Sequence, residues 1–166
     1  MLERTKPTRT LFPAITKSEI EQIESHFRHP LPMDYRDFLL EFNGAFFQSP
    51  LGFHTSDGDD EDDYPLLYRL YGMCPSVGVE STDDVRFAGR AYDFQNRVPE
   101  GIVAIGDDNS WNFVCLSLRQ DTCGSIYYWE PGEPWEMAGS IRTWEFLSPV
   151  AATFREFCDR LFMPRT

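Results

Sequence analysis

Apolar residues recur at helical spacing in the segment from residue 31 to residue 44. They stand at i, i+3, i+4 and i+7, as one face of an amphipathic helix requires: Tyr35, Phe38, Leu39 and Phe42. Pro32 suits the first turn, because proline fixes φ and lacks the backbone N–H that would be unpaired there. At the other end, Asn43-Gly44 offers a left-handed residue to end a helix. The pattern predicts a short helix with both ends marked.

An earlier helix is predicted from a capping box and a second apolar face. Thr16-Lys17-Ser18-Glu19 has the Thr-x-x-Glu spacing of such a box. The buried face would consist of Ile20, Ile23 and Phe27. The prolines before the next helix interrupt the chain, so the two helices should form an αα-hairpin. Residues 1–14 carry two prolines and little periodicity, which predicts an extended lead-in.

Short runs rich in aromatic and branched residues follow this hairpin and predict strands. They cover residues 45–47, 66–71, 102–105, 112–118, 125–130 and 142–146. Ser81 or Thr82 would cap a short helix reaching about Phe94. Ser148-Pro149 should open a final helix with Val150, Phe154, Phe157 and Leu161 along one side. Helices at both ends and hairpin-linked strands between them indicate an α+β single domain with a mainly antiparallel sheet.

Several of these segments, in this order, resemble the SUKH superfamily, or Smi/Knr-type domain. The most specific is the second helix, with Leu-Pro, an acidic residue and Tyr, then Phe-Leu, then Asn-Gly. Similar segments stand before and after it: residues 15–24, 105–108, 112–116, 124–130 and 153–157. The resemblance runs from about Thr16 to Phe162, and it implies a SUKH-like domain over residues 15–163.

This resemblance implies a domain that acts by binding proteins and not as an enzyme. Bacterial members are known chiefly as immunity proteins, which bind a cognate polymorphic or contact-dependent toxin in the cytoplasm and block it by stoichiometric inhibition. Eukaryotic relatives include regulators of fungal cell-wall assembly. A compact single domain fits the bacterial role better. Two alternatives stay open: an intracellular regulatory or scaffold protein of the Smi/Knr type, and a small-ligand-binding domain.

The net charge of −12 restricts the partners. Phosphate neutralisation needs clustered Lys and Arg, whereas lysine occurs only at Lys6 and Lys17, so nucleic-acid binding is not expected. Anionic membranes would be repelled as well. An acidic protein attracts basic partners and associates with them faster at low salt. The expected partner is therefore a basic toxin such as a nuclease; the sequence leaves the oligomeric state open.

Candidate partner-binding residues are carboxylates and the tryptophans that lie beside them in loops. They are Asp57, Asp59, Asp60, Glu61, Asp62, Asp63, Asp107, Asp108, Trp111, Glu133, Trp135 and Glu136. A loop tryptophan beside carboxylates has the composition of an interface hot spot with an acidic rim. Each ring could equally fold back over the sheet, and the run from Asp57 to Asp63 could be a solvated loop. Trp129, inside a strand, is predicted to be buried.

The sequence gives little evidence for a catalytic or metal-binding site. An EF-hand beginning at Asp57 or Asp59 would need glutamate where Tyr68 or Leu70 stands. His26 and His29 lack an H-E-x-x-H arrangement, and interaction with a helix C-terminus explains them. There is no G-x-S-x-G elbow and no glycine-rich phosphate loop. We therefore expect no enzyme activity, no metal and no cofactor.

The cysteines and the apolar runs indicate the compartment. Cys115 and Cys158 stand in apolar segments and should be buried thiols. A Cys115–Cys123 disulfide across a hairpin is conceivable, but reduced thiols are the prediction for a cytosolic chain. No run reaches the length of a membrane span, and the N-terminus lacks a signal-peptide pattern. These observations predict a cytoplasmic protein.

Overall fold

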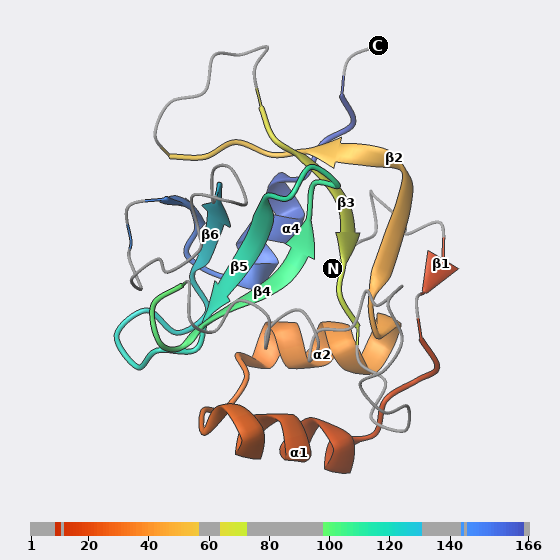
Figure 1. Ribbon diagram of the computed structural model, residues 1–166. Helices are drawn as coiled ribbons and strands as arrows, with labels where there is room; N and C mark the ends of the chain where they lie inside the picture. The colour runs from red at the N-terminus through yellow and green to blue at the C-terminus, as the bar shows by residue number, and fades with distance from the viewer. Residues whose placement is uncertain are drawn as a thin grey trace.

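Two helices form a hairpin at one end of the molecule, shown at the bottom of Figure 1. The computed structural model describes residues 9–10, 12–56, 64–72, 98–130, 144 and 146–164. Helix α1 covers Lys17–Phe27 and helix α2 covers Met33–Phe42. Both halves of the predicted capping box are present at Thr16, and Asn43 ends α2 in the left-handed conformation with φ 45°. The predicted αα-hairpin is confirmed.

The described strands form one seven-stranded sheet in chain order, β1-β2-β3-β4-β5-β6-β7. Every neighbouring pair is antiparallel, so the chain runs as a meander. The strands are β1 Arg9–Thr10, β2 Ala45–Gly52, β3 Leu66–Leu70, β4 Ile102–Asp107, β5 Phe113–Ser117, β6 Ile126–Trp129 and β7 Leu147–Ala151. Strand β1 comes from the segment predicted as an extended lead-in. The α+β class with an antiparallel sheet is confirmed.

The C-terminal part of the chain departs from the sequence-based prediction. Residues 147–151 form β7 on the sheet edge, whereas a helix was predicted to open at Ser148-Pro149. Helix α4 instead covers Phe154–Arg160, and the Thr153 hydroxyl caps it by accepting a hydrogen bond from the Glu156 N–H at 3.1 Å. An edge strand tolerates a proline because one side of the strand has no ladder to lose.

Two other predicted elements lie largely outside the described residues. The helix expected from Ser81 or Thr82 to about Phe94 lies wholly outside them. Of the strand expected over residues 142–146, only residues 144 and 146 are described, and neither lies within a strand.

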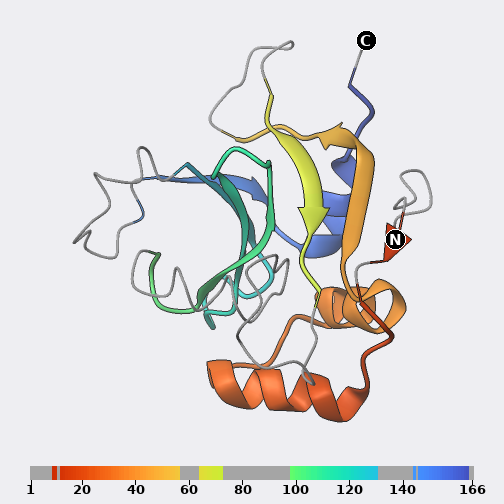
Figure 2. The ribbon, with the colours of Figure 1, turned by 45° about the vertical axis from the view of Figure 1, so that its right-hand side comes forward.

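Helix α4 joins the sheet to the helical hairpin, and the sheet curves around it (Figures 1 and 2). Phe154 is fully buried, with ring centroids 4.9 Å from Tyr35 and 5.2 Å from Phe38 of α2. On the same helix, the Phe157 ring lies 5.5 Å from that of Phe53, which follows β2. Aromatic pairs at these distances add stabilisation beyond their buried area. The core is therefore an aromatic cluster that connects all layers.

The meander places its turns at two opposite ends of the sheet. Strands β2, β4 and β6 end, and β3, β5 and β7 begin, at the end away from α1 and α2 (Figure 1). The turn between β4 and β5 lies at this end, at the top of the figure. The start of β4 and the end of α1 lie at the other.

Candidate protein-interaction site

The turn between β4 and β5 presents an exposed tryptophan in an unusual backbone conformation. Trp111 is 64% exposed and has φ 71°, and Asn109 in the same turn has φ 64°. A bulky residue rarely adopts positive φ, because its Cβ crowds the backbone. Such a conformation costs free energy and persists only where the surroundings hold it. Hydrogen bonds around the turn must therefore hold it in this conformation.

Asp108 holds the turn from inside. One carboxylate oxygen, Oδ1, accepts hydrogen bonds from the backbone N–H groups of Ser110 at 2.6 Å and Asn112 at 3.1 Å. The other, Oδ2, accepts from the Asn112 side-chain amide at 2.8 Å and the Tyr128 hydroxyl at 3.0 Å. Burial and the neighbouring Asp108 charge raise the pKa of Tyr128, which stays a neutral donor. Both oxygens are thus engaged in fixing the turn and its attachment to β6.

Asp107 forms a second, deeper network. It is 4% exposed and accepts a forked bond from Arg69 Nε at 2.9 Å to both oxygens, and one from the Tyr71 hydroxyl at 2.6 Å. The Asn109 N–H also donates to it at 3.0 Å, and Arg69 reaches the Asn109 side chain at 3.1 Å. A buried carboxylate needs such partners to offset desolvation. This network fixes the turn to β3.

The sequence-predicted residues of this turn therefore have three different environments. Trp111 is exposed, Asp108 is half-buried with its oxygens engaged, and Asp107 is buried against Arg69. Sequence reasoning missed Arg69 and Tyr71, which supply the support from β3. An arginine within an otherwise apolar strand was the signal that could have indicated an internal carboxylate.

The remaining predicted partner-binding residues lie outside the described residues: Asp57, Asp59, Asp60, Glu61, Asp62, Asp63, Glu133, Trp135 and Glu136. Residues that flank these segments are described. Glu130, at the end of β6, donates its N–H to the Phe146 carbonyl just before β7. Phe146 is 47% exposed. A second exposed aromatic side chain therefore stands at the same end of the sheet as the Trp111 turn.

The other described tryptophans contribute less to this end. Trp129 is buried, as predicted, and its ring lies 5.6 Å from that of Phe113. Trp144 packs edge-on against Tyr127 at 5.5 Å, and the Arg119 guanidinium lies 5.6 Å from the Trp144 ring. Trp144 therefore covers part of the sheet, whereas Trp111 projects from a turn.

Potential reactive groups are few in the described part of the chain. Burial raises the pKa of the Cys115 thiol and raises that of Cys158 to about 12, so both stay protonated and unreactive. Cys115, Cys123 and Cys158 are free thiols. Among the described residues no three His, Cys, Asp or Glu side chains cluster as a metal site would need. No described helix has the length and apolar content that crossing a bilayer requires.

Comparison with known proteins agrees with the family resemblance. The sequence model of the SMI1 / KNR4 family (SUKH-1) matches residues 14–160. The chain is also similar to the SPbeta prophage-derived uncharacterized protein YokK of Bacillus subtilis (strain 168). The two are 25% identical over 134 residues, covering 72% of this chain and 64% of YokK. The chain thus spans less than two thirds of that relative's length.

Proposed function

We propose that this chain, which belongs to the SMI1 / KNR4 family (SUKH-1), is an immunity protein. It would bind a cognate polymorphic or contact-dependent toxin domain and neutralise it in the cytoplasm by one-to-one association, without catalysis. The bacterial branch of the SUKH resemblance supports this role, and the similarity to a prophage-derived bacterial protein is compatible with it.

The observation that carries the proposal is the exposed Trp111 on a turn held in a strained conformation. Tryptophan is enriched among the few residues that dominate the binding energy of protein interfaces. A flexible turn would lose conformational entropy on binding, whereas one fixed by Asp108 and Asp107 has already lost it on folding. Trp111 is therefore suited to anchor a partner protein, with Phe146 adding apolar area at the same end.

Charge enters the proposal through the other carboxylates. Asp107 is paired with Arg69, so its charge contributes little to the field outside the protein. We assign steering of a basic toxin, such as a nuclease, to the run Asp57–Asp63 and to Glu133 and Glu136, with Trp135 as a further anchor. Asp108 contributes by shaping the turn.

The first experiment uses a candidate toxin domain taken from a gene that neighbours the gene of this chain. Co-expression of the chain should restore growth of cells that produce this toxin domain. Light scattering after gel filtration should show a one-to-one complex. Trp111→Ala should weaken binding about 30-fold, as loss of a hot-spot side chain of roughly 2 kcal/mol predicts. Absence of both rescue and complex would overturn the immunity role.

The matched control is Met33→Ala. Met33 is 79% exposed and begins α2, at the opposite end of the molecule from the Trp111 turn (Figure 1). The substitution removes a large exposed apolar side chain without changing the proposed surface, so toxin binding should stay as in the wild type. If Trp111→Ala and Met33→Ala bind alike while the wild-type complex forms, the surface is assigned wrongly and the immunity role stands.

Neutralising the run Asp57–Asp63 tests the electrostatic part. Replacing its carboxylates by the matching amides should slow association with the toxin and flatten the salt dependence of the association rate, because steering acts mainly on encounter. Stopped-flow measurements at low and high salt give both quantities. An unchanged rate at low salt would exclude this run from steering.

A further inference from the structure

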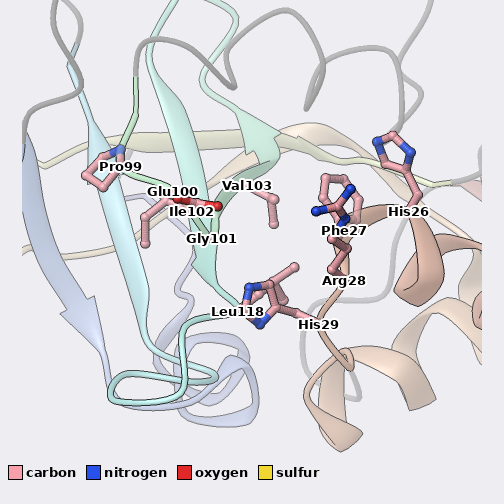
Figure 3. A pocket seen from close by; sticks show the side chains of 10 residues that line it. All are labelled: His26, Phe27, Arg28, His29, Pro99, Glu100, Gly101, Ile102, Val103 and Leu118. Atoms are coloured by element: carbon pink, nitrogen blue, oxygen red, sulfur yellow. The ribbon is translucent and has the colours of Figure 1, made fainter.

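A pocket lies where the end of α1 meets the start of β4, at the other end of the molecule from the Trp111 turn (Figure 3). Its cavity volume is about 290 Å³. The apolar part of its lining includes Phe27, Ile102, Val103 and Leu118, of which the last three are buried. Small-molecule sites combine such an apolar lining with a few polar groups that fix orientation.

The α1 side of this pocket is basic. His26, Arg28 and His29 line it together, in a protein whose net charge is −12. The end of α1 is already closed by backbone bonds, since the N–H groups of Arg28 and His29 both donate to the Glu24 carbonyl. The left-handed conformation of Arg28, with φ 57°, turns the chain at this point. The Glu24 carbonyl is therefore satisfied by the backbone.

Two of these side chains lack partners within the described part of the chain. Neither the Arg28 guanidinium nor the His29 imidazole makes a hydrogen bond or ion pair with a described residue. Four other arginines each pair with a carboxylate: Arg36, Arg69, Arg119 and Arg160. An unpaired guanidinium beside an apolar surface is well placed to receive an anion.

One carboxylate also lines the pocket, from the opposite side. Glu100 precedes β4 and faces the α1 end across the pocket in Figure 3. It would repel an anion at its own side of the pocket and so confine the negative group of a ligand to the Arg28 side. Removing the Arg28 charge and removing the Glu100 charge should therefore change anion binding in opposite directions.

We propose that this pocket binds a small organic oxyanion: a carboxylate or phosphate group on a compact apolar body. The anionic group would accept hydrogen bonds from Arg28 and His29, and the apolar body would cover Ile102, Val103 and Leu118. Guanidinium binds both oxyanions through parallel N–H donors. The site is independent of the proposed toxin surface, which lies at the other end of the sheet.

Titrations followed by two-dimensional ¹H–¹⁵N NMR test the proposal with benzoate, phenyl phosphate and neutral benzamide. The two anions should shift the backbone amides of Arg28, His29, Gly101 and Leu118. Benzamide should bind about tenfold more weakly, a difference of about 1.4 kcal/mol, because it offers no charge to the guanidinium. Tighter binding of phenyl phosphate would indicate a phosphorylated natural ligand, and tighter binding of benzoate a carboxylic acid.

Three variants separate a specific site from general electrostatics. Arg28→Gln should weaken benzoate binding about tenfold, and Glu100→Gln should strengthen it. Arg155→Gln removes the same charge from α4, outside this pocket, and should leave binding as in the wild type. Equal binding of benzoate and benzamide, no shift at the pocket amides, or equal effects of Arg28→Gln and Arg155→Gln would each overturn the proposal.

Discussion

Two adjacent carboxylates in the β4–β5 turn have different roles although the sequence presents them as a pair. Asp107 points into the protein and pairs with Arg69 and Tyr71. Asp108 faces the turn and bonds its backbone. Successive residues at a strand end point to opposite sides, so neighbours in sequence face different surroundings. At the scale of the residue, charge alone did not reveal which of the two acids is buried.

Asp108→Asn tests the role of this acid. The amide retains one acceptor oxygen but places an N–H₂ group against either the Asn112 amide or the turn N–H groups, which are donors themselves. We expect a loss of about 1–3 kcal/mol in the free energy of unfolding. Urea denaturation measures this loss. Stability equal to that of the wild type would show that these bonds do not hold the turn.

At the scale of the element, the predicted helices agree with the structure mainly where capping residues mark their ends. The Thr16 capping box fixes the start of α1 through the Glu19 N–H at 3.3 Å and the Thr16 N–H at 2.7 Å. The sequence offers two residues that could cap the C-terminal helix, Ser148 and Thr153. Thr153 is the cap in the structure, because residues 147–151 pair with β6 and a helix that began at Ser148 would lose this pairing.

The capping box also makes a prediction about pH. Hydrogen bonds from the Thr16 backbone N–H and then its hydroxyl lower the pKa of Glu19 from its usual 4.5. A pKa that is lower in the folded state stabilises the fold above the unfolded-state value, and this stabilisation is lost as the pH falls through the folded-state value. Thr16→Ala should raise the Glu19 pKa part of the way toward its usual value. Loss of the N-cap hydroxyl should also lower the free energy of unfolding by about 1 kcal/mol.

Carbon-13 NMR titration of the Glu19 carboxyl group measures the pKa, and urea denaturation measures the stability. Thr16→Ser retains the hydroxyl and serves as the control, with both quantities close to the wild type. A Glu19 pKa that is the same in Thr16→Ala and Thr16→Ser would show that the hydroxyl does not contribute.

At the scale of the whole molecule, α4 connects elements that are far apart in the chain. Phe154 packs against α2 and Phe157 against Phe53, so the curved sheet and the helical hairpin share one aromatic core. This aromatic core lies between the two ends of the sheet. The Trp111 turn lies at one end and the oxyanion pocket at the other, so the same core supports both proposed sites.

Phe154→Ala should destabilise the whole fold. A fully buried phenylalanine replaced by alanine loses about 3–5 kcal/mol of unfolding free energy, because a cavity remains between α4 and α2. Phe146→Ala, which removes a ring that is 47% exposed, should cost about 0.5 kcal/mol. Urea unfolding of both variants gives the comparison; similar losses would mean that α4 does not link the layers.

Much of the fold could be predicted because its signals are local. The αα-hairpin follows from capping residues and the i, i+3, i+4 spacing, and the five strands that matched, β2 to β6, follow from short aliphatic and aromatic runs. The candidate site was predicted only in part. Trp111 was identified from its loop context, but its support from Arg69 and Tyr71 depends on pairing between β3 and β4, which are more than thirty residues apart.

The sequence by itself determined the start of α1, both ends of α2, the α+β class and the family, because caps, periodicity and the Leu-Pro helix are carried by neighbouring residues. Only the tertiary structure decided which carboxylate is buried, where the last helix begins, and that His26, Arg28 and His29 meet Glu100 around one pocket. These outcomes depend on sheet pairing and on packing between distant segments. Their energies are set by burial and partners, which no local pattern of residues encodes.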